Sequence, residues 1–274
     1  MSYTVRVYLY SFRFLKVVSK VQPKNPPRIW WCANGPLSFL PLHAAGLYNP
    51  NFAGDKISDY VVSSYAPTLN TLLHQSAEIN PEEFKLLTVA ESSTLPFTLH
   101  EVEVINQLTT MVAVVNLTDK DATKDRVVQE MERSTWTHLA CHGKQNVKSP
   151  MTSGLILHDE ELELSQLIKM RLHRADFAFL SACQTAVGDE AVPEESVHLA
   201  AGMLFAGYRG LIATMWSIND EDAPKIADIV YQRILKGGKP NRKGAAHALS
   251  EAVKQLRDSG ADFQSWVPFI HMGC

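Results

Sequence analysis

Apolar residues occur along this chain in short blocks, separated by longer segments with helical spacing. Nearly uninterrupted apolar or β-branched blocks lie at residues 85–90, 112–117, 176–180 and 211–216. Such blocks are typical of strands buried on both faces of a parallel sheet. The segments between them repeat apolar positions every three or four residues, which predicts helices. The alternation of the two patterns predicts an α/β protein with a mainly parallel central sheet and helices on both faces.

Turn and capping signals at the ends of these segments define the expected elements. The block at residues 112–117 predicts a buried strand. Residues 1–28 are expected to be an N-terminal segment of unclear structure, closed by three prolines, and residues 29–274 one folded domain. Strands are expected at residues 29–32, 60–65, 85–90, 112–117, 137–140, 154–158, 176–180, 211–216 and 266–271. Helices are expected at residues 99–108, 124–133, 164–172, 197–206, 223–235 and 245–256.

Two of the predicted strands run directly into side chains that can carry chemistry. His142 follows the strand at 137–140, and Cys183, 41 positions further on, follows the strand at 176–180. In open α/β sheets, functional groups gather where the strands end. If the two strands are neighbours, His142 and Cys183 emerge side by side.

This pair suits nucleophilic catalysis. A free thiol is mostly protonated at neutral pH, and a neighbouring imidazole can take its proton and later return it to a leaving amine. The N–H of Gly143, directly after the histidine, is a natural donor to the oxyanion that forms on the attacked carbonyl.

Other interpretations of these residues stay open. A lone buried cysteine is usually structural. Cys141 competes as nucleophile, but a residue adjacent to His142 in a strand points to the opposite face and is expected in the core. A metal site could combine Cys183 with other histidines, although no pair has a recognised ligand spacing. The histidines in question are His138, His158, His198 and His271.

Composition narrows the function classes. The formal net charge is −3 with both signs intermixed, so neither a nucleic acid nor an anionic membrane is an expected partner. The four cysteines contain no CxxC pair, which argues against a disulfide framework and a zinc site. Free thiols and the lack of a long apolar run favour a cytoplasmic protein. No cofactor or metal is expected.

Four stretches of the sequence carry a resemblance to a known family. They are residues 30–46 (WWCANGPLSFLPLHAAG), 138–143 (HLACHG), 179–185 (FLSACQT) and 213–220 (ATMWSIND). In these residues, in this order, the chain resembles the CHAT domain family, whose members are relatives of caspases and separases and often follow TPR repeats. Caspases carry an Ala-Cys core with a histidine roughly 50 residues upstream, which is similar to Ala182-Cys183 and His142 here.

The resemblance implies a caspase-like three-layer sandwich, with His142 as general base and Cys183 as nucleophile. It also implies a protein substrate, and a regulatory partner or a helical-repeat protein is a further expected partner. The leading hypothesis is a cysteine endopeptidase that could require activation. The alternative is a catalytically silent CHAT-type interaction or signalling module.

An acidic loop follows the predicted strand at 211–216, and it suggests a substrate preference. Asp220 and Asp222 lie in this loop, and Asp189 follows the nucleophile. A carboxylate here could bind a lysine or arginine at P1, the residue before the cleaved bond. The alternative role for Asp220 and Asp222 is to start the helix at 223–235 through capping and the helix dipole.

Overall fold

The computed structural model describes residues 26–48, 56–73, 80–109, 112–144, 146, 148–181, 184–185 and 194–274. Residues 1–25, most of the predicted N-terminal segment, lie outside the described residues. The domain boundary expected at residue 29 stays a prediction. Within the described ranges, no helix combines the length and the apolar character needed to cross a bilayer.

An eight-stranded sheet forms the centre of the protein, in the order β1-β2-β12-β11-β9-β5-β3-β4. Neighbouring strands in it are parallel except where β11 meets β12. The mainly parallel sheet expected from the apolar blocks is therefore confirmed. Its strands are β1 (Arg28–Trp31), β2 (Val62–Tyr65), β3 (Lys85–Ala90), β4 (Ala113–Thr118), β5 (Trp136–Ala140), β9 (Phe177–Leu180), β11 (Gly210–Thr214) and β12 (Phe269–Gly273).

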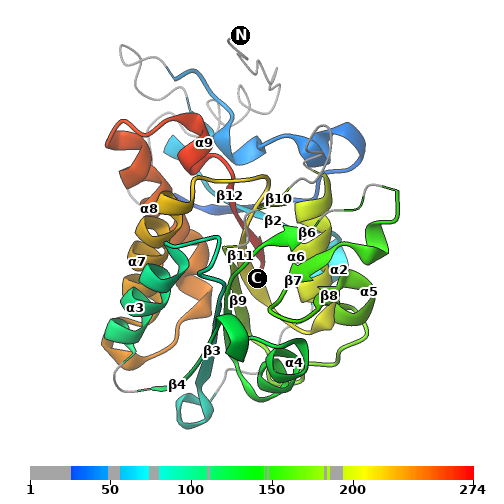
Figure 1. Cartoon of the computed structure of the whole chain (residues 1–274). Helices are drawn as coiled ribbons and strands as arrows, with labels where there is room; N and C mark the ends of the chain where they lie inside the picture. The colour runs from blue at the N-terminus through cyan, green and yellow to red at the C-terminus, as the bar shows by residue number, and fades with distance from the viewer. Residues whose placement is uncertain are drawn as a thin grey trace.

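Helices cover both faces of this sheet (Figure 1), as expected. Trp136 and Phe177 pack with α3, α7 and α8 on one face, while Leu139 and Leu180 pack with α4, α5 and α6 on the other. Successive strand side chains point to opposite faces, so β5 and β9 supply both cores. The helices are α2 (Leu69–Leu73), α3 (Thr98–Leu108), α4 (Lys124–Arg133), α5 (Leu164–Leu167), α6 (Glu194–Ala206), α7 (Ala223–Ile234), α8 (Ala245–Asp258) and α9 (Phe263–Trp266).

A second, four-stranded sheet lies beside the first, and only one of its strands was expected, at 154–158, where β7 ends earlier, at Ile156. Its order is β10-β6-β7-β8. These strands have only two or three residues each, too short for a periodicity to show. They are β6 (Gly143–Lys144), β7 (Gly154–Ile156), β8 (Glu161–Glu163) and β10 (Gln184–Thr185).

Several expected elements differ from the structure in their bounds or burial, and three of these differences have a clear physical reason. The strand expected at 266–271 begins at Phe269, because the Asp262 side chain caps a helix that runs to Trp266. The helix expected at 164–172 ends at Leu167, and the N–H of Leu172 donates instead to the carbonyl of Ala206, at 2.8 Å. The strand at 112–117 is not buried: β4 forms an edge of the sheet, and only Leu117 within it is fully buried.

Gly207 ends α6, as the sequence predicts. Its φ is +132°, and a Cβ there would lie 2.6 Å from the carbonyl oxygen of Leu172. We expect Gly207→Ala to lower the free energy of unfolding by about 1–3 kcal/mol, because it adds both backbone strain and a clash. Denaturant unfolding measures this loss. Gly260→Ala is the matched control, since its φ is +89° but nothing lies within 4 Å of the added Cβ, and an equal loss in both variants would contradict the clash.

Candidate active site

The structure makes neighbours of the two strands that lead to His142 and Cys183. β5 and β9 pair in parallel, with Leu139 opposite Leu180, and the N–H of Ser181 donates to the carbonyl of Leu139 at 2.9 Å. The carboxyl ends of both strands therefore meet at one edge of the sheet, as the predicted dyad requires. Ala182 and Cys183 themselves lie outside the described residues.

The same register resumes beyond these two residues. β6 and β10 are also parallel, with Gly143 opposite Gln184 and Lys144 opposite Thr185. Each pair is offset by 41 residues, as Leu139 and Leu180 are. The residue after His142 is thus paired with the residue after Cys183.

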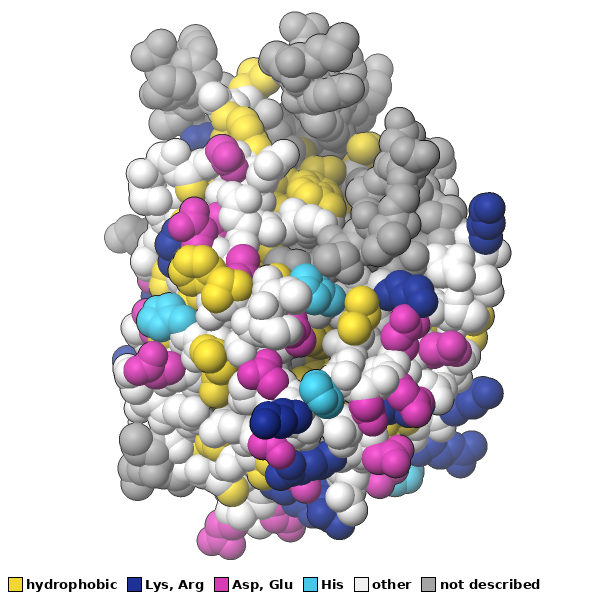
Figure 2. Space-filling model, in the orientation of Figure 1, with side chains coloured by type: hydrophobic (Ala, Val, Ile, Leu, Met, Phe, Trp, Pro, Cys, Tyr) yellow, Lys and Arg dark blue, Asp and Glu magenta, His cyan; other side chains and the backbone are white. Residues whose placement is uncertain are grey.

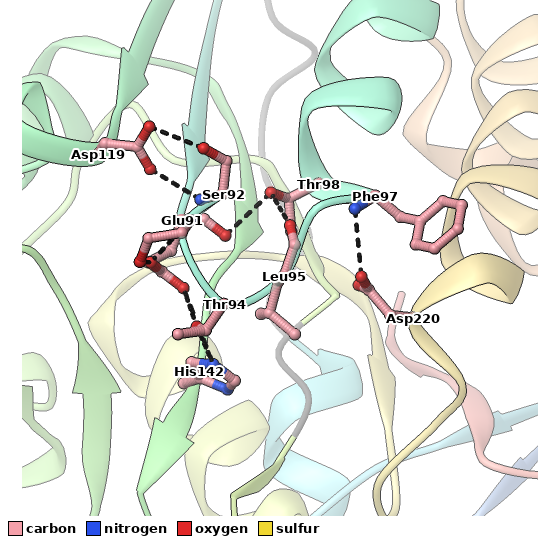
Figure 3. A network of polar contacts seen from close by, with 10 residues as sticks. Glu91, Ser92, Thr94, Leu95, Phe97, Thr98, Asp119, His142 and Asp220 are labelled. Atoms are coloured by element: carbon pink, nitrogen blue, oxygen red, sulfur yellow. Dashed lines mark hydrogen bonds and ion pairs between the residues drawn. The ribbon is translucent and has the colours of Figure 1, made fainter.

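The imidazole of His142 is held by the loop between β3 and α3 (Figure 3). Its Nε2 lies 2.6 Å from Oγ1 of Thr94 and 3.8 Å from Oε2 of Glu91. Thr94 Oγ1 in turn donates to Glu91 Oε2 at 2.5 Å. The His142 side chain is 16% exposed, whereas Thr94 is exposed, so the network lies at the surface of the site.

This network indicates which nitrogen of the neutral His142 ring carries the hydrogen. Burial acts to raise the pKa of Glu91, but hydrogen bonds from Ser93 and Thr94 and the charge of His142 prevail and lower it, so Glu91 is a carboxylate that only accepts. The single hydroxyl hydrogen of Thr94 goes to Glu91, and Thr94 accepts from Nε2–H of His142. The unprotonated nitrogen of the neutral ring is then Nδ1. It is buried and has no hydrogen-bond partner among the described residues.

A second carboxylate fixes the loop that carries Glu91 and Thr94. Asp119, at the end of β4, accepts from the N–H and the hydroxyl of Ser92, both at 2.7 Å. Figure 3 shows these contacts on the far side of Glu91 from His142. Asp119 has φ +48°, a left-handed conformation that aspartate tolerates better than most residues.

Gly143 is buried between two strands of the second sheet. The carbonyl of His142 accepts from the N–H of Ile156 on β7, at 2.8 Å. Along an antiparallel pair the backbone groups alternate in direction, so those of Gly143 turn away from β7 toward β10. That places its N–H on the side where β10 begins, one residue after Cys183. The role of this N–H as an oxyanion donor stays a prediction.

The two carboxylates of the acidic loop have different surroundings. Asp220 is partly exposed, and its Oδ2 accepts from the N–H of Phe97 at 3.2 Å. Burial raises its pKa, against the opposing effects of the Phe97 N–H and the charge of His142. Asp222 is buried and pairs with Lys225 at 2.9 Å, at the start of α7. The structure therefore leaves the Asp220 carboxylate partly exposed and under the electrostatic influence of His142, whereas the Asp222 carboxylate is buried. Asp189 lies outside the described residues.

The other candidate groups are placed away from this edge or in the core. Cys141 is buried in the core with Leu139, as predicted. No group of three or more potential metal ligands occurs among the residues that the structure describes. A cavity of about 850 Å³ lies elsewhere, between α8 and β2, and its described lining includes none of the predicted site residues. The face seen in Figure 2 intermixes acidic and basic side chains.

Comparison with solved structures identifies the class of fold. The Arg-specific cysteine proteinase gingipain R matches with TM-score 0.60 at 11% identity, over 96% of this chain and 66% of that chain. A complex of the pro- and mature domains of Porphyromonas gingivalis RgpB matches with TM-score 0.58 at 10% identity, over 96% and 67%. The Saccharomyces cerevisiae separase–securin complex matches with TM-score 0.54 at 12% identity, over 78% of this chain and 14% of that chain. The protein therefore has the fold of caspase-like cysteine peptidases.

The profile of the CHAT domain family matches residues 9–274, and the chain belongs to this family. No curated protein matched the sequence. The chain spans 66% of the gingipain chain and 14% of the separase chain, so at these identities the likeness concerns the fold.

Two residues of the His142 network were not anticipated from the sequence. Glu91 comes directly after the strand at 85–90, and Thr94 lies three residues further on. The rule that functional groups follow strand ends would have identified Glu91 as a candidate. Nothing local to the sequence identifies Thr94, because its contact with His142 spans 48 residues.

Proposed function

We propose that this protein is a cysteine endopeptidase that cleaves a protein substrate, with Cys183 as nucleophile and His142 as general base. The observation that carries the proposal is the constant register on both sides of the two residues, from β5 and β9 to β6 and β10. Neighbouring strands lie about 4.8 Å apart, which suits contact between a thiol and an imidazole. Membership of the CHAT family and the peptidase fold of the structural neighbours support the same assignment.

In this mechanism Nδ1 of His142 takes the proton from the Cys183 thiol. Nδ1 is the buried nitrogen without a partner among the described residues, and the Glu91 carboxylate, 3.8 Å from Nε2, stabilises the imidazolium that forms. The thiolate attacks the substrate carbonyl, and the imidazolium returns the proton to the leaving amine. Water then hydrolyses the thioester. The N–H of Gly143 is the proposed donor to the oxyanion.

We further propose a basic residue at P1, bound by Asp220. Its carboxylate is partly exposed and within electrostatic reach of His142. A peptidase with a matching fold is described as Arg-specific. Asp189 stays a second candidate for this contact.

Asp220→Asn should raise KM for substrates with P1 arginine about 10- to 100-fold, because a charge-assisted contact is lost. In the wild type, KM for these substrates should rise as the pH falls through the pKa of Asp220, which burial raises above the ordinary 3.8. The variant should lack this pH dependence. Asp222→Asn is the control and should leave KM nearly unchanged, since its buried carboxylate pairs with Lys225.

Cleavage of a denatured-protein peptide library, with the cut bonds identified by mass spectrometry, tests both parts of the proposal. Cuts after arginine or lysine that disappear in Cys183→Ala support it. Cuts after aspartate or apolar residues would contradict the basic P1 preference. No cuts by the wild type would instead favour the alternative function, a catalytically silent CHAT-type interaction module.

A further inference from the structure

A buried polar cluster lies beneath the strand ends that carry the candidate dyad. Its members are Glu101 on α3, His138 on β5, Ser181 after β9 and Tyr231 on α7. Glu101, His138 and Tyr231 are 0% exposed and Ser181 is 2% exposed. Burying a carboxylate costs free energy of desolvation unless each of its oxygens has a polar partner. The partners of the two Glu101 oxygens therefore indicate what this residue does.

The two oxygens of Glu101 contact two different strands. Oε1 accepts from the hydroxyl of Ser181 at 3.1 Å. Oε2 lies 3.1 Å from Nε2 of His138. The angle at this second contact departs from hydrogen-bond geometry, yet neither atom has another hydrogen-bond partner among the described residues. Each atom therefore has the other as its nearby polar contact.

The hydrogens of the cluster fit one arrangement. Burial and the charge of Glu101 raise the pKa of Tyr231 well above its usual value, so its phenol keeps its hydrogen. The Tyr231 oxygen lies 3.3 Å from Nδ1 of His138. If Tyr231 donates to Nδ1, the hydrogen of the neutral ring is on Nε2 and faces Glu101. Hydrogen bonds then join α7 to β5 and α3 to β9, and the 3.1 Å contact between His138 and Glu101 links the two pairs.

We propose that Glu101 is a positioning residue that fixes the ends of β5 and β9 relative to each other, and with them His142 and Cys183. His138 precedes His142 by four positions, and Ser181 precedes Cys183 by two. One carboxylate thus holds both chain segments just before each member of the pair. This inference rests on the proposed function for its catalytic consequence.

The test compares Glu101→Gln with a matched control, Asp176→Asn. Asp176 is also a buried carboxylate that joins the same two strands: it precedes β9 and accepts from Nε1 of Trp136 on β5, at 3.0 Å. It does so at the amino ends of these strands, away from the candidate site. Ser181→Ala is a second test variant. It removes only the hydrogen bond from Ser181 to Glu101, and it replaces Glu101→Gln as the test if that variant does not fold.

Two quantities are measured in each intact variant. The first is the rate at which iodoacetamide alkylates Cys183 at pH 6, resolved by peptide mass spectrometry, because this reagent reacts with the thiolate. The second is hydrogen exchange at the N–H of Ser181, which donates to the carbonyl of Leu139. The partly exposed Cys32 is the internal reference for an ordinary thiol.

We expect Glu101→Gln and Ser181→Ala to slow alkylation of Cys183 about tenfold or more, since misplacement of a reacting group by 1 Å is costly. Both should speed exchange at Ser181 about tenfold, and Asp176→Asn should change neither rate by more than about threefold. Equal effects in Asp176→Asn, or no effect in the two test variants, would overturn the inference. If wild-type Cys183 reacts no faster than Cys32, the proposed peptidase chemistry fails instead, and exchange at Ser181 still decides the role of Glu101.

Discussion

Cys183→Ala is expected to lower kcat/KM for peptide hydrolysis by at least about 10³-fold, to the background of the assay. Removing the thiol removes the covalent route, because the alanine side chain has no nucleophilic group. The parallel pairs on either side, Leu139 with Leu180 and Gly143 with Gln184, support the proposal that this residue acts with His142. Initial rates on the best substrate from the peptide library measure the change.

Cys141→Ala is the control for this prediction. Cys141 is 1% exposed and packs in the core with Leu139, so its loss should lower stability and leave most of kcat/KM. Activity that survives in Cys183→Ala and disappears in Cys141→Ala would reverse the assignment of the nucleophile.

His142→Ala is expected to lower kcat about 10²- to 10⁴-fold with little change in KM, because proton transfer is lost while substrate contacts remain. Steady-state kinetics on the same substrate measure both constants. The exposed His158 provides a matched control, and His158→Ala should be indistinguishable from the wild type. A loss in kcat of less than about tenfold in His142→Ala would mean that another group accepts the thiol proton.

The sequence predicted the central sheet and the pair of strand ends well, for a physical reason. β3, β5, β9 and β11 are buried on both faces, so their apolar blocks need no long-range information to be recognised. The same logic failed for β4, where a β-branched run lies at the sheet edge. An apolar block indicates that a strand forms. The position of that strand in the sheet depends on the strands it pairs with, which lie elsewhere in the chain.

The polar partners of the candidate site could not be predicted in the same way. The contacts of His142 with Thr94 and of Ser181 with Glu101 join residues 48 and 80 positions apart. They exist only because β3 lies next to β5 and α3 packs on one face of the sheet. Glu101 also falls on a helix whose spacing is explained by its apolar residues alone, so its burial gives no local signal.

The acidic loop shows how folding separates residues that the sequence presents as equivalent. Asp220 and Asp222 are two positions apart, and both were expected either to bind a basic side chain or to start α7. In the structure Asp222 is buried at the start of the helix and forms an ion pair with Lys225. Asp220 turns instead to the N–H of Phe97, on the loop that also holds His142. Asp222 lies at the helix start without a side-chain capping hydrogen bond, and Asp220 is the proposed contact for the substrate.

Labelling of the intact protein with a thiol-directed, activity-based probe tests the central claim most directly, with the modified residue mapped by mass spectrometry. The account predicts modification at Cys183 that is lost in Cys183→Ala and strongly slowed in His142→Ala. Labelling that is unchanged by Cys183→Ala, or that maps to Cys141, would contradict it.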